Sequence, residues 1–81
     1  MSHRGSVGVP LKVGVIGCGG VAQVIHLPLL SKHPDVKIQA ICEVDTSKAA
    51  ILADKFDIPL FYEDVAEMFN KEQLDAVFIL T

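Results

Sequence analysis

The chain has 81 residues, of which 51% are hydrophobic and 21% are charged, and its formal net charge is −3. This composition predicts a folded globular chain and argues against a disordered one. The basic residues form no stripe, so the charge pattern gives no support for binding nucleic acids or anionic membranes. A chain of this length holds one small layered structure rather than two domains.

Two cysteines, Cys18 and Cys42, stand outside any C-x-x-C pair and outside metal-ligand spacing with histidine. Free thiols suggest a reducing compartment. No stretch approaches the roughly 20 apolar residues of a membrane span. The first ten residues also lack an apolar run like the core of a signal peptide. We therefore expect a cytoplasmic protein without a metal site.

The first half of the chain predicts a strand followed by a helix. Residues 1–10 contain glycine, serine and proline and predict a flexible leader. The apolar run over residues 11–17 predicts a strand that is covered on both faces, as in a parallel sheet. Residues 21–30 show helical spacing, in which Pro28 predicts a kink or break near residues 24–28.

The second half continues the alternation. Residues 36–42 alternate and then turn apolar, which predicts a second strand. A helix is predicted over residues 48–56, with capping residues at 45–47. Residues 58–62 are expected to form a short extended link. Asp64 is expected to cap a shorter helix, and residues 75–81 predict a third strand.

This order predicts an α/β fold with a parallel sheet and right-handed crossovers. It is a βαβαβ unit, one incomplete half of a three-layer, doubly wound Rossmann fold. Residues 11–81 are expected to be the N-terminal part of a dinucleotide-binding domain. A sheet of three strands leaves the first strand as an open edge, which predicts self-association or marginal stability.

A glycine-rich loop joins the first strand to its helix. It reads Gly17-Cys18-Gly19-Gly20-Val21-Ala22, the G-x-G-x-x-A form of the dinucleotide fingerprint. Gly17 permits a sharp turn, Gly19 lets a pyrophosphate approach the backbone, and Ala22 lets the helix pack closely on the strand. The helix that begins here points free N–H groups at the phosphates. The alternative is a turn whose glycines serve only packing.

An acidic residue stands where the fingerprint expects one. Glu43 lies 21 residues after Ala22, at the end of the second predicted strand. A carboxylate there accepts hydrogen bonds from the adenosine ribose and repels a ribose 2′-phosphate, which favours NAD over NADP. No arginine follows Glu43, and Lys48 is the nearest cation. The alternative is a solvated acid at a strand end.

Four segments carry a resemblance to a known family: Lys12–Ala22, His26–Leu30, Ala40–Asp45 and Leu74–Thr81. In these segments residues 11–81 resemble the N-terminal domain of the glucose-fructose oxidoreductase, inositol dehydrogenase and rhizopine-catabolism (Gfo/Idh/MocA) family. The His26-Leu27-Pro28 piece is the most specific part, because many Rossmann domains share the rest. In the family an aspartate is commoner than a glutamate at the position of Glu43.

The resemblance implies NAD(P)-dependent hydride transfer with sugars, cyclitols or related alcohols as substrates. It implies that Leu80 and Thr81 lie near the ribose and nicotinamide side of the cofactor. The family's Glu-Lys-Pro motif, with its catalytic lysine, and its substrate residues match nothing before Thr81, so we expect no catalytic residue here. Together with the motif, it predicts these cofactor-binding residues: Gly17, Cys18, Gly19, Gly20, Val21, Ala22, Glu43, Leu80 and Thr81.

Rival interpretations remain at this point. The chain alone would bind NAD without catalysis, which also describes a stand-alone nucleotide-sensing or regulatory module. An S-adenosylmethionine-dependent methyltransferase is disfavoured, because its loop usually reads Gly-x-Gly-x-Gly. We expect His26 to be a packed or partly exposed residue rather than a ligand. Cys18 lies at a helix start, which can lower a thiol pKa, but no partner base is evident.

Overall fold

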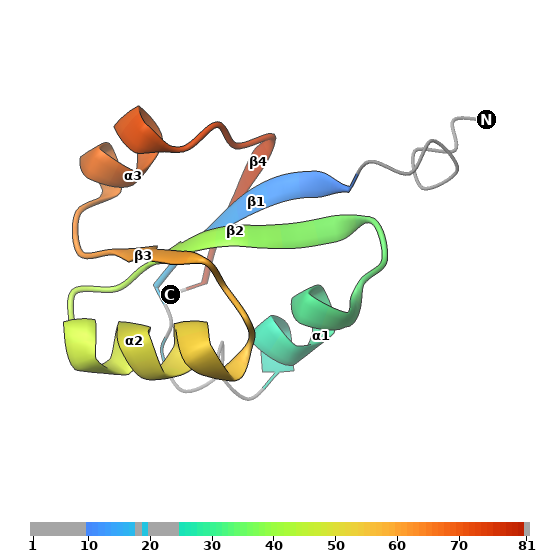
Figure 1. The fold of residues 1–81 in the computed structure, drawn as a ribbon, viewed down its shortest axis with the longest axis horizontal. Helices are drawn as coiled ribbons and strands as arrows, with labels where there is room; N and C mark the ends of the chain where they lie inside the picture. Colours follow the sequence, from blue (N-terminus) through green and yellow to red (C-terminus); the bar gives the residue numbers. More distant parts are fainter. Residues whose placement is uncertain (1–9, 18, 20–24, 81) are drawn as a thin grey trace.

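The computed structural model describes residues 10–17, 19 and 25–80 (Figure 1). All of the expected leader except Pro10 lies outside the described residues. The elements in chain order are β1 (Leu11–Ile16), α1 (Leu27–Lys32), β2 (Val36–Cys42), α2 (Thr46–Lys55), β3 (Leu60–Tyr62), α3 (Val65–Lys71) and β4 (Ala76–Ile79).

The strands form one parallel sheet in the order β3-β2-β1-β4. The predicted α/β fold with a parallel sheet is therefore confirmed, with one strand more than expected. Residues 58–62 were expected to be an extended link. That expectation is wrong for Leu60–Tyr62, because these residues pair with Ala40–Cys42 of β2.

The predicted place of the first strand is also wrong. β1 is central rather than at an edge, because β4 pairs with its free side over Val13–Ile16. The open edges of the described sheet are β3 and β4. On β4, Phe78 is 38% exposed and Ile79 is 68% exposed. Self-association stays a prediction, but the strands that would carry it are β3 and β4, since Phe61 on β3 is also 41% exposed.

Helices cover both faces of the sheet. Figure 1 shows α1 and α2 below the sheet and α3 above it. The side of α1 and α2 holds the larger core cluster: Val13, Val15, Leu27, Ile38, Ile41, Ala49, Leu52, Ala53 and Ile58. The side of α3 holds a smaller one: Ala40, Cys42, Tyr62 and Met68. This arrangement is the three-layer form expected of a doubly wound sheet.

An extra residue in β2 explains its mixed sequence pattern. The partner of Val13 is Ile38 and the partner of Gly14 is Ala40, so Gln39 has no counterpart on β1. Such a bulge shifts the alternation of faces by one residue. Ile38 therefore packs with the larger cluster, whereas Ala40 packs with the smaller one.

Aspartates begin the second and third helices, as predicted. Asp45 Oδ1 accepts from the backbone N–H of Lys48 at 3.1 Å, and Asp64 Oδ2 accepts from that of Glu67 at 2.9 Å. Each bond satisfies a donor that the first helical turn leaves unpaired. The cap lets α2 begin at Thr46, two residues before the predicted start.

The helix predicted over residues 21–30 is observed only in part. Residues 21–24 lie outside the described residues, residues 25–26 have π-helical geometry, and α1 follows from Leu27 to Lys32. Pro28 lies in the first turn of α1, where its missing N–H costs no helical hydrogen bond. The predicted break near residues 24–28 agrees with this change of geometry at residues 25–26.

Candidate functional site

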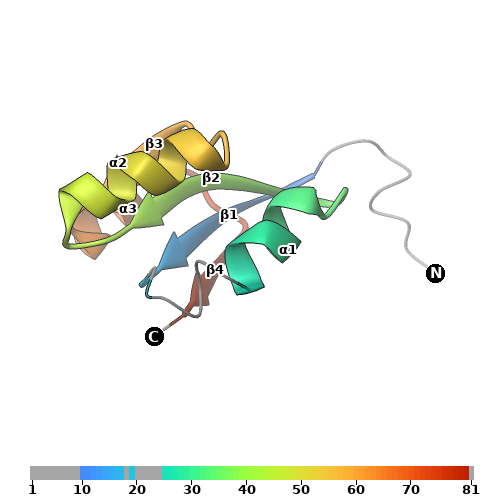
Figure 2. The same ribbon diagram turned by 90° about the horizontal axis from the view of Figure 1, so that it is seen from below.

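The predicted site residues that the structure describes gather where the parallel strands end. Viewed as in Figure 2, the arrowheads of β1, β2 and β4 point to the same side of the molecule. We call this side the carboxyl edge; it consists of the strand ends and the residues that follow them, Gly17, Glu43, Glu63 and Leu80. In open α/β sheets, ligands bind outside the carboxyl ends of the strands.

Backbone hydrogen bonds hold these residues in fixed relation to one another. The N–H of Gly17 donates to the carbonyl of Cys42 at 3.1 Å, and the N–H of Leu80 donates to that of Ile16 at 2.8 Å. The N–H of Glu43 donates to the carbonyl of Tyr62 at 2.8 Å. Gly17, Glu43 and Leu80 are thus brought together as neighbours along one edge, although up to 63 positions separate them in the sequence.

The structure describes two glycines of the loop, and the reason for glycine differs between the two positions. Gly17 has φ 79°, a left-handed conformation that side chains rarely adopt. Gly19 is exposed, and a Cβ added to it would meet no heavy atom within 4 Å. Conformation accounts for glycine at position 17, whereas packing within the described part of the chain gives no reason for glycine at position 19.

Glu43 is partly buried and is tied to the start of α2. Its Oε2 accepts from the backbone N–H of Asp45 at 3.1 Å. Asp45 in turn caps α2 through Lys48, as described above. The sequence placed Glu43 at the end of a strand but gave no sign that a neighbouring backbone N–H would bind its carboxylate.

Five of the predicted cofactor-binding residues lie outside the described residues: Cys18, Gly20, Val21, Ala22 and Thr81. The family-specific segment is described. His26 is exposed, and Leu27 beside it is fully buried in the larger core cluster. The expectation that His26 is a partly exposed residue on the helix agrees with this placement.

Cys42 lies one residue before Glu43 and is a buried free thiol. Burial, with smaller contributions from the nearby carboxylates of Asp64 and Glu43, raises the pKa of this thiol. A raised pKa keeps the thiol protonated and unreactive at neutral pH. Cys42 is therefore a packing residue of the strand, in the smaller core cluster.

A polar cluster under α3 was not predicted. Tyr62 donates its hydroxyl to Glu72 Oε2, and Gln39 Nε2 donates to Glu72 Oε1 at 3.2 Å. The hydrogen bond to Glu72, followed by burial, raises the pKa of Tyr62 to about 12. The three residues come from β2, β3 and the end of α3, so no local sequence signal could have joined them. They fix α3 against the sheet.

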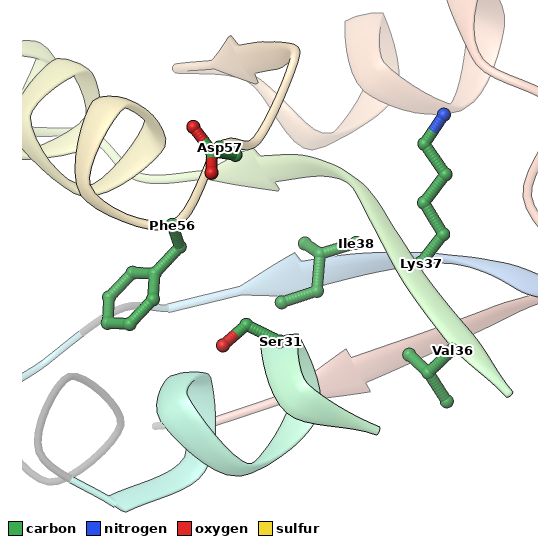
Figure 3. A pocket seen from close by; sticks show the side chains of 6 residues that line it. All are labelled: Ser31, Val36, Lys37, Ile38, Phe56 and Asp57. Atoms are coloured by element: carbon green, nitrogen blue, oxygen red, sulfur yellow. The ribbon is translucent and has the colours of Figure 1, made fainter. Parts of the chain in front are cut away.

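Surface hollows lie away from the carboxyl edge. One of about 250 Å³ is lined by Ser31, Val36, Lys37, Ile38, Phe56 and Asp57 (Figure 3). These residues belong to the first part of β2 and to the ends of α1 and α2, which is the opposite end of the sheet from Glu43. In Figure 3 the ammonium group of Lys37 extends away from Ser31 and Phe56. The charged group of Lys37 is therefore not directed toward Ser31 and Phe56 in this hollow.

Two further features of the described residues bear on the kind of protein. Within them, no group of three or more His, Cys, Asp or Glu side chains is arranged to hold a metal ion. Their helices are also too short and too polar for any one of them to cross a membrane.

The fold that carries this edge matches a known protein family. A family profile described as "Oxidoreductase family, NAD-binding Rossmann fold" matches residues 11–81. The fold and this match define the chain as an NAD-binding Rossmann domain of an oxidoreductase. The profile is that of the Gfo/Idh/MocA proteins, and the chain belongs to this family.

Individual relatives have defined activities or ligands. The chain is 30% identical over 70 residues to D-glucoside 3-dehydrogenase of Escherichia coli (strain K12). The aligned residues cover 86% of this chain and 20% of the relative. Scyllo-inositol dehydrogenase from Lactobacillus casei, solved with bound NAD(H) and scyllo-inositol, superposes with a TM-score of 0.80 and 26% identity. That match covers 89% of this chain and 21% of the other.

An oxidoreductase from Agrobacterium radiobacter, solved with NAD⁺, L-tartaric acid and magnesium, gives a TM-score of 0.80 at 32% identity. It covers 90% of this chain and 21% of that chain. The chain thus spans about a fifth of the length of the relatives it matches.

Proposed function

We propose that this chain is the NAD-binding part of an oxidoreductase and that the carboxyl edge holds the cofactor. The observation that carries the proposal is the placement of Gly17 and Glu43 at the ends of two adjacent parallel strands, β1 and β2. Dinucleotides bind across this point of a doubly wound sheet. Residues 11–81 would then form the N-terminal part of the binding domain.

The pyrophosphate would lie along the loop Gly17-Cys18-Gly19-Gly20-Val21-Ala22. The positive φ of Gly17 supports a sharp turn out of β1. The open space around Gly19 supports a close approach of phosphate oxygens to the backbone, because no side chain of the described residues occupies it. These two observations fit a phosphate cradle better than they fit a turn built only for packing.

The adenine ribose would bind to Glu43. A carboxylate accepts hydrogen bonds from both hydroxyls of this ribose, whereas it repels the additional phosphate of NADP. Glu43 is only partly buried at this edge. We therefore assign NAD, rather than NADP, as the preferred cofactor.

The substrate would be a sugar, a cyclitol or a related alcohol, with NAD supplying the hydride acceptor when bound. The names of the matched relatives, a glucoside dehydrogenase and an inositol dehydrogenase, support this class. Leu80, at the end of β4 beside β1, and Thr81 would lie toward the nicotinamide side. The acid/base group for hydride transfer is expected outside these residues, so the chain alone would bind NAD without catalysing a reaction.

Calorimetric titration of the 81-residue chain with NAD, NADP and ADP-ribose tests the proposal. We expect binding of NAD and ADP-ribose, weaker binding of NADP, and loss of this order in Glu43→Ala. The chain should produce no NADH when inositol or a glucoside is added with NAD. Equal affinity of the wild-type chain and Glu43→Ala for NAD would contradict the ribose assignment.

A further inference from the structure

The carboxylate of Glu43 is held by a residue that itself has no place in the dinucleotide fingerprint. The backbone N–H of Asp45 donates to Glu43 Oε2 at 3.1 Å. Hydrogen bonds to an ionised acceptor are stronger and more directional than those between neutral groups. The direction of this one N–H therefore influences where the Glu43 carboxylate points.

The Asp45 backbone is fixed in turn by its own side chain. Its Oδ1 accepts from the N–H of Lys48 at 3.1 Å, and its carbonyl accepts from the N–H of Ala49 at 2.9 Å. Both bonds anchor Asp45 to the first turn of α2, a helix of ten residues. The cap thus restrains the backbone angles of Asp45, and these angles set the direction of its own N–H, which donates to Glu43.

We propose that Asp45 is the positioning residue for cofactor selection: by capping α2 it holds the Glu43 carboxylate in the orientation that accepts a ribose diol and repels a 2′-phosphate. This inference rests on the proposed function, because it requires that Glu43 meets the ribose. Without the cap, Asp45 keeps only the bond from the Ala49 N–H to its carbonyl, and the direction of its own N–H is less restrained. The hydrogen bond from this N–H to Glu43 then weakens, and the difference between NAD and NADP shrinks.

The chain offers a matched control for this effect. Asp64 caps α3 as Asp45 caps α2, through a bond of 2.9 Å to the N–H of Glu67. Its carboxylate also lies near Cys42, whose pKa it raises. Asp64→Ala therefore removes a helix cap and a negative charge close to the end of β2, while the cap of α2 stays intact.

The test measures the ratio of the NADP dissociation constant to the NAD dissociation constant in the 81-residue chain. The variants are Asp45→Ala, Asp45→Gly and Asp45→Asn, with Glu43→Gln and Asp64→Ala alongside. Glycine at a cap position costs little stability, so Asp45→Gly keeps the test valid if Asp45→Ala fails to fold. Asparagine keeps the cap without the charge, which separates positioning from direct repulsion of the phosphate by Asp45.

We expect the ratio to fall about three- to tenfold in Asp45→Ala and Asp45→Gly, the size of effect expected for loss of one ordinary hydrogen bond. It should stay near the wild-type value in Asp45→Asn and in Asp64→Ala. An equal fall in Asp45→Asn or Asp64→Ala would overturn the inference, because charge or general destabilisation would then explain it. An unchanged ratio in Asp45→Ala and Asp45→Gly, with a reduced ratio in Glu43→Gln, would overturn the positioning role alone. An unchanged ratio in Glu43→Gln would overturn the proposed ribose contact as well.

Discussion

Asp57, just after α2, adopts a backbone conformation that favours glycine. Its φ is 55°, whereas its side chain is exposed. The N–H of Ile58 donates to the carbonyl of Ala53 at 2.8 Å, and the N–H of Asp57 donates to that of Asp54 at 3.4 Å. This pair of bonds is the Schellman ending of a helix, in which the left-handed position is usually glycine. Replacing Asp57 by glycine should therefore stabilise the fold.

The size of the gain follows from three contributions, of which one opposes the other two. A left-handed conformation costs a non-glycine residue roughly 1–2 kcal/mol, and aspartate lies at the lower end because its short polar side chain tolerates this region. Glycine also destabilises the folded state by about 0.4–1 kcal/mol, because it increases the conformational entropy of the unfolded chain. Removing a negative charge from the C-terminal end of a helix adds about 0.3 kcal/mol. The net expectation for Asp57→Gly is a stabilisation of about 0.5–1 kcal/mol.

Thermal and urea unfolding followed by circular dichroism measures this gain. A stabilisation of this size raises Tm by roughly 2–8 °C in a domain of this length. Asp57→Asn should also stabilise, by less, whereas Asp57→Ala should not. As the control, Ala50→Gly places glycine at an exposed position inside α2 and should destabilise by about 1 kcal/mol. A lower Tm for Asp57→Gly than for the wild type would refute the reasoning about the helix end.

Three other predictions concern the packing of the sheet. Tyr62 is the single tyrosine of the chain, and folding raises the pKa of its hydroxyl from 10.0 to about 12. The stability that this hydroxyl adds in its protonated form is therefore complete below pH 10. It is lost as the pH rises from 10 to about 12. An absorbance titration of tyrosinate should show this raised midpoint in the folded protein, and Glu72→Gln should lower it; an unchanged midpoint would count against the hydrogen bond. Gly14→Val should cost about 1–3 kcal/mol in urea unfolding, because even a Cβ would lie 2.8 Å from Leu74 Cδ1 and 3.2 Å from Met68 Cε. Wild-type stability would show that Leu74 and Met68 pack less closely on β1 than described. Asp75→Ala should lower the free energy of unfolding by about 1 kcal/mol, since Asp75 Oδ2 accepts from the backbone N–H of Lys12 at 2.8 Å. Asp75→Asn should recover part of this loss. An equal loss in both variants would argue against the hydrogen bond.

The features that the sequence predicted well depend on near neighbours. The caps at Asp45 and Asp64 each need only a donor three residues further on. Glycine at position 17 follows from the turn that leaves β1, and the place of Glu43 follows from the apolar strand that ends directly before it. Local geometry determines all four features, so they can be predicted from a single sequence.

The features that it missed depend on pairing between distant segments. Leu60–Tyr62 is too short to be distinguished from a link until its partner in β2 is known. β1 is central only because β4 pairs with its other side, and the residues of β1 themselves do not indicate which strand will pair there. The bulge at Gln39 and the hydrogen bond from Tyr62 to Glu72 likewise arise from packing across the sheet and α3.

The central claim is that NAD binds at the carboxyl edge. The most direct test is an NMR titration of the nitrogen-labelled 81-residue chain with NAD, read from the backbone amide shifts. The account predicts the largest changes at Gly17, Gly19, Glu43 and Leu80, with little change at Lys37. Changes centred instead on the hollow beside Lys37 and Asp57, with the amides of Gly17 and Glu43 unmoved, would contradict it.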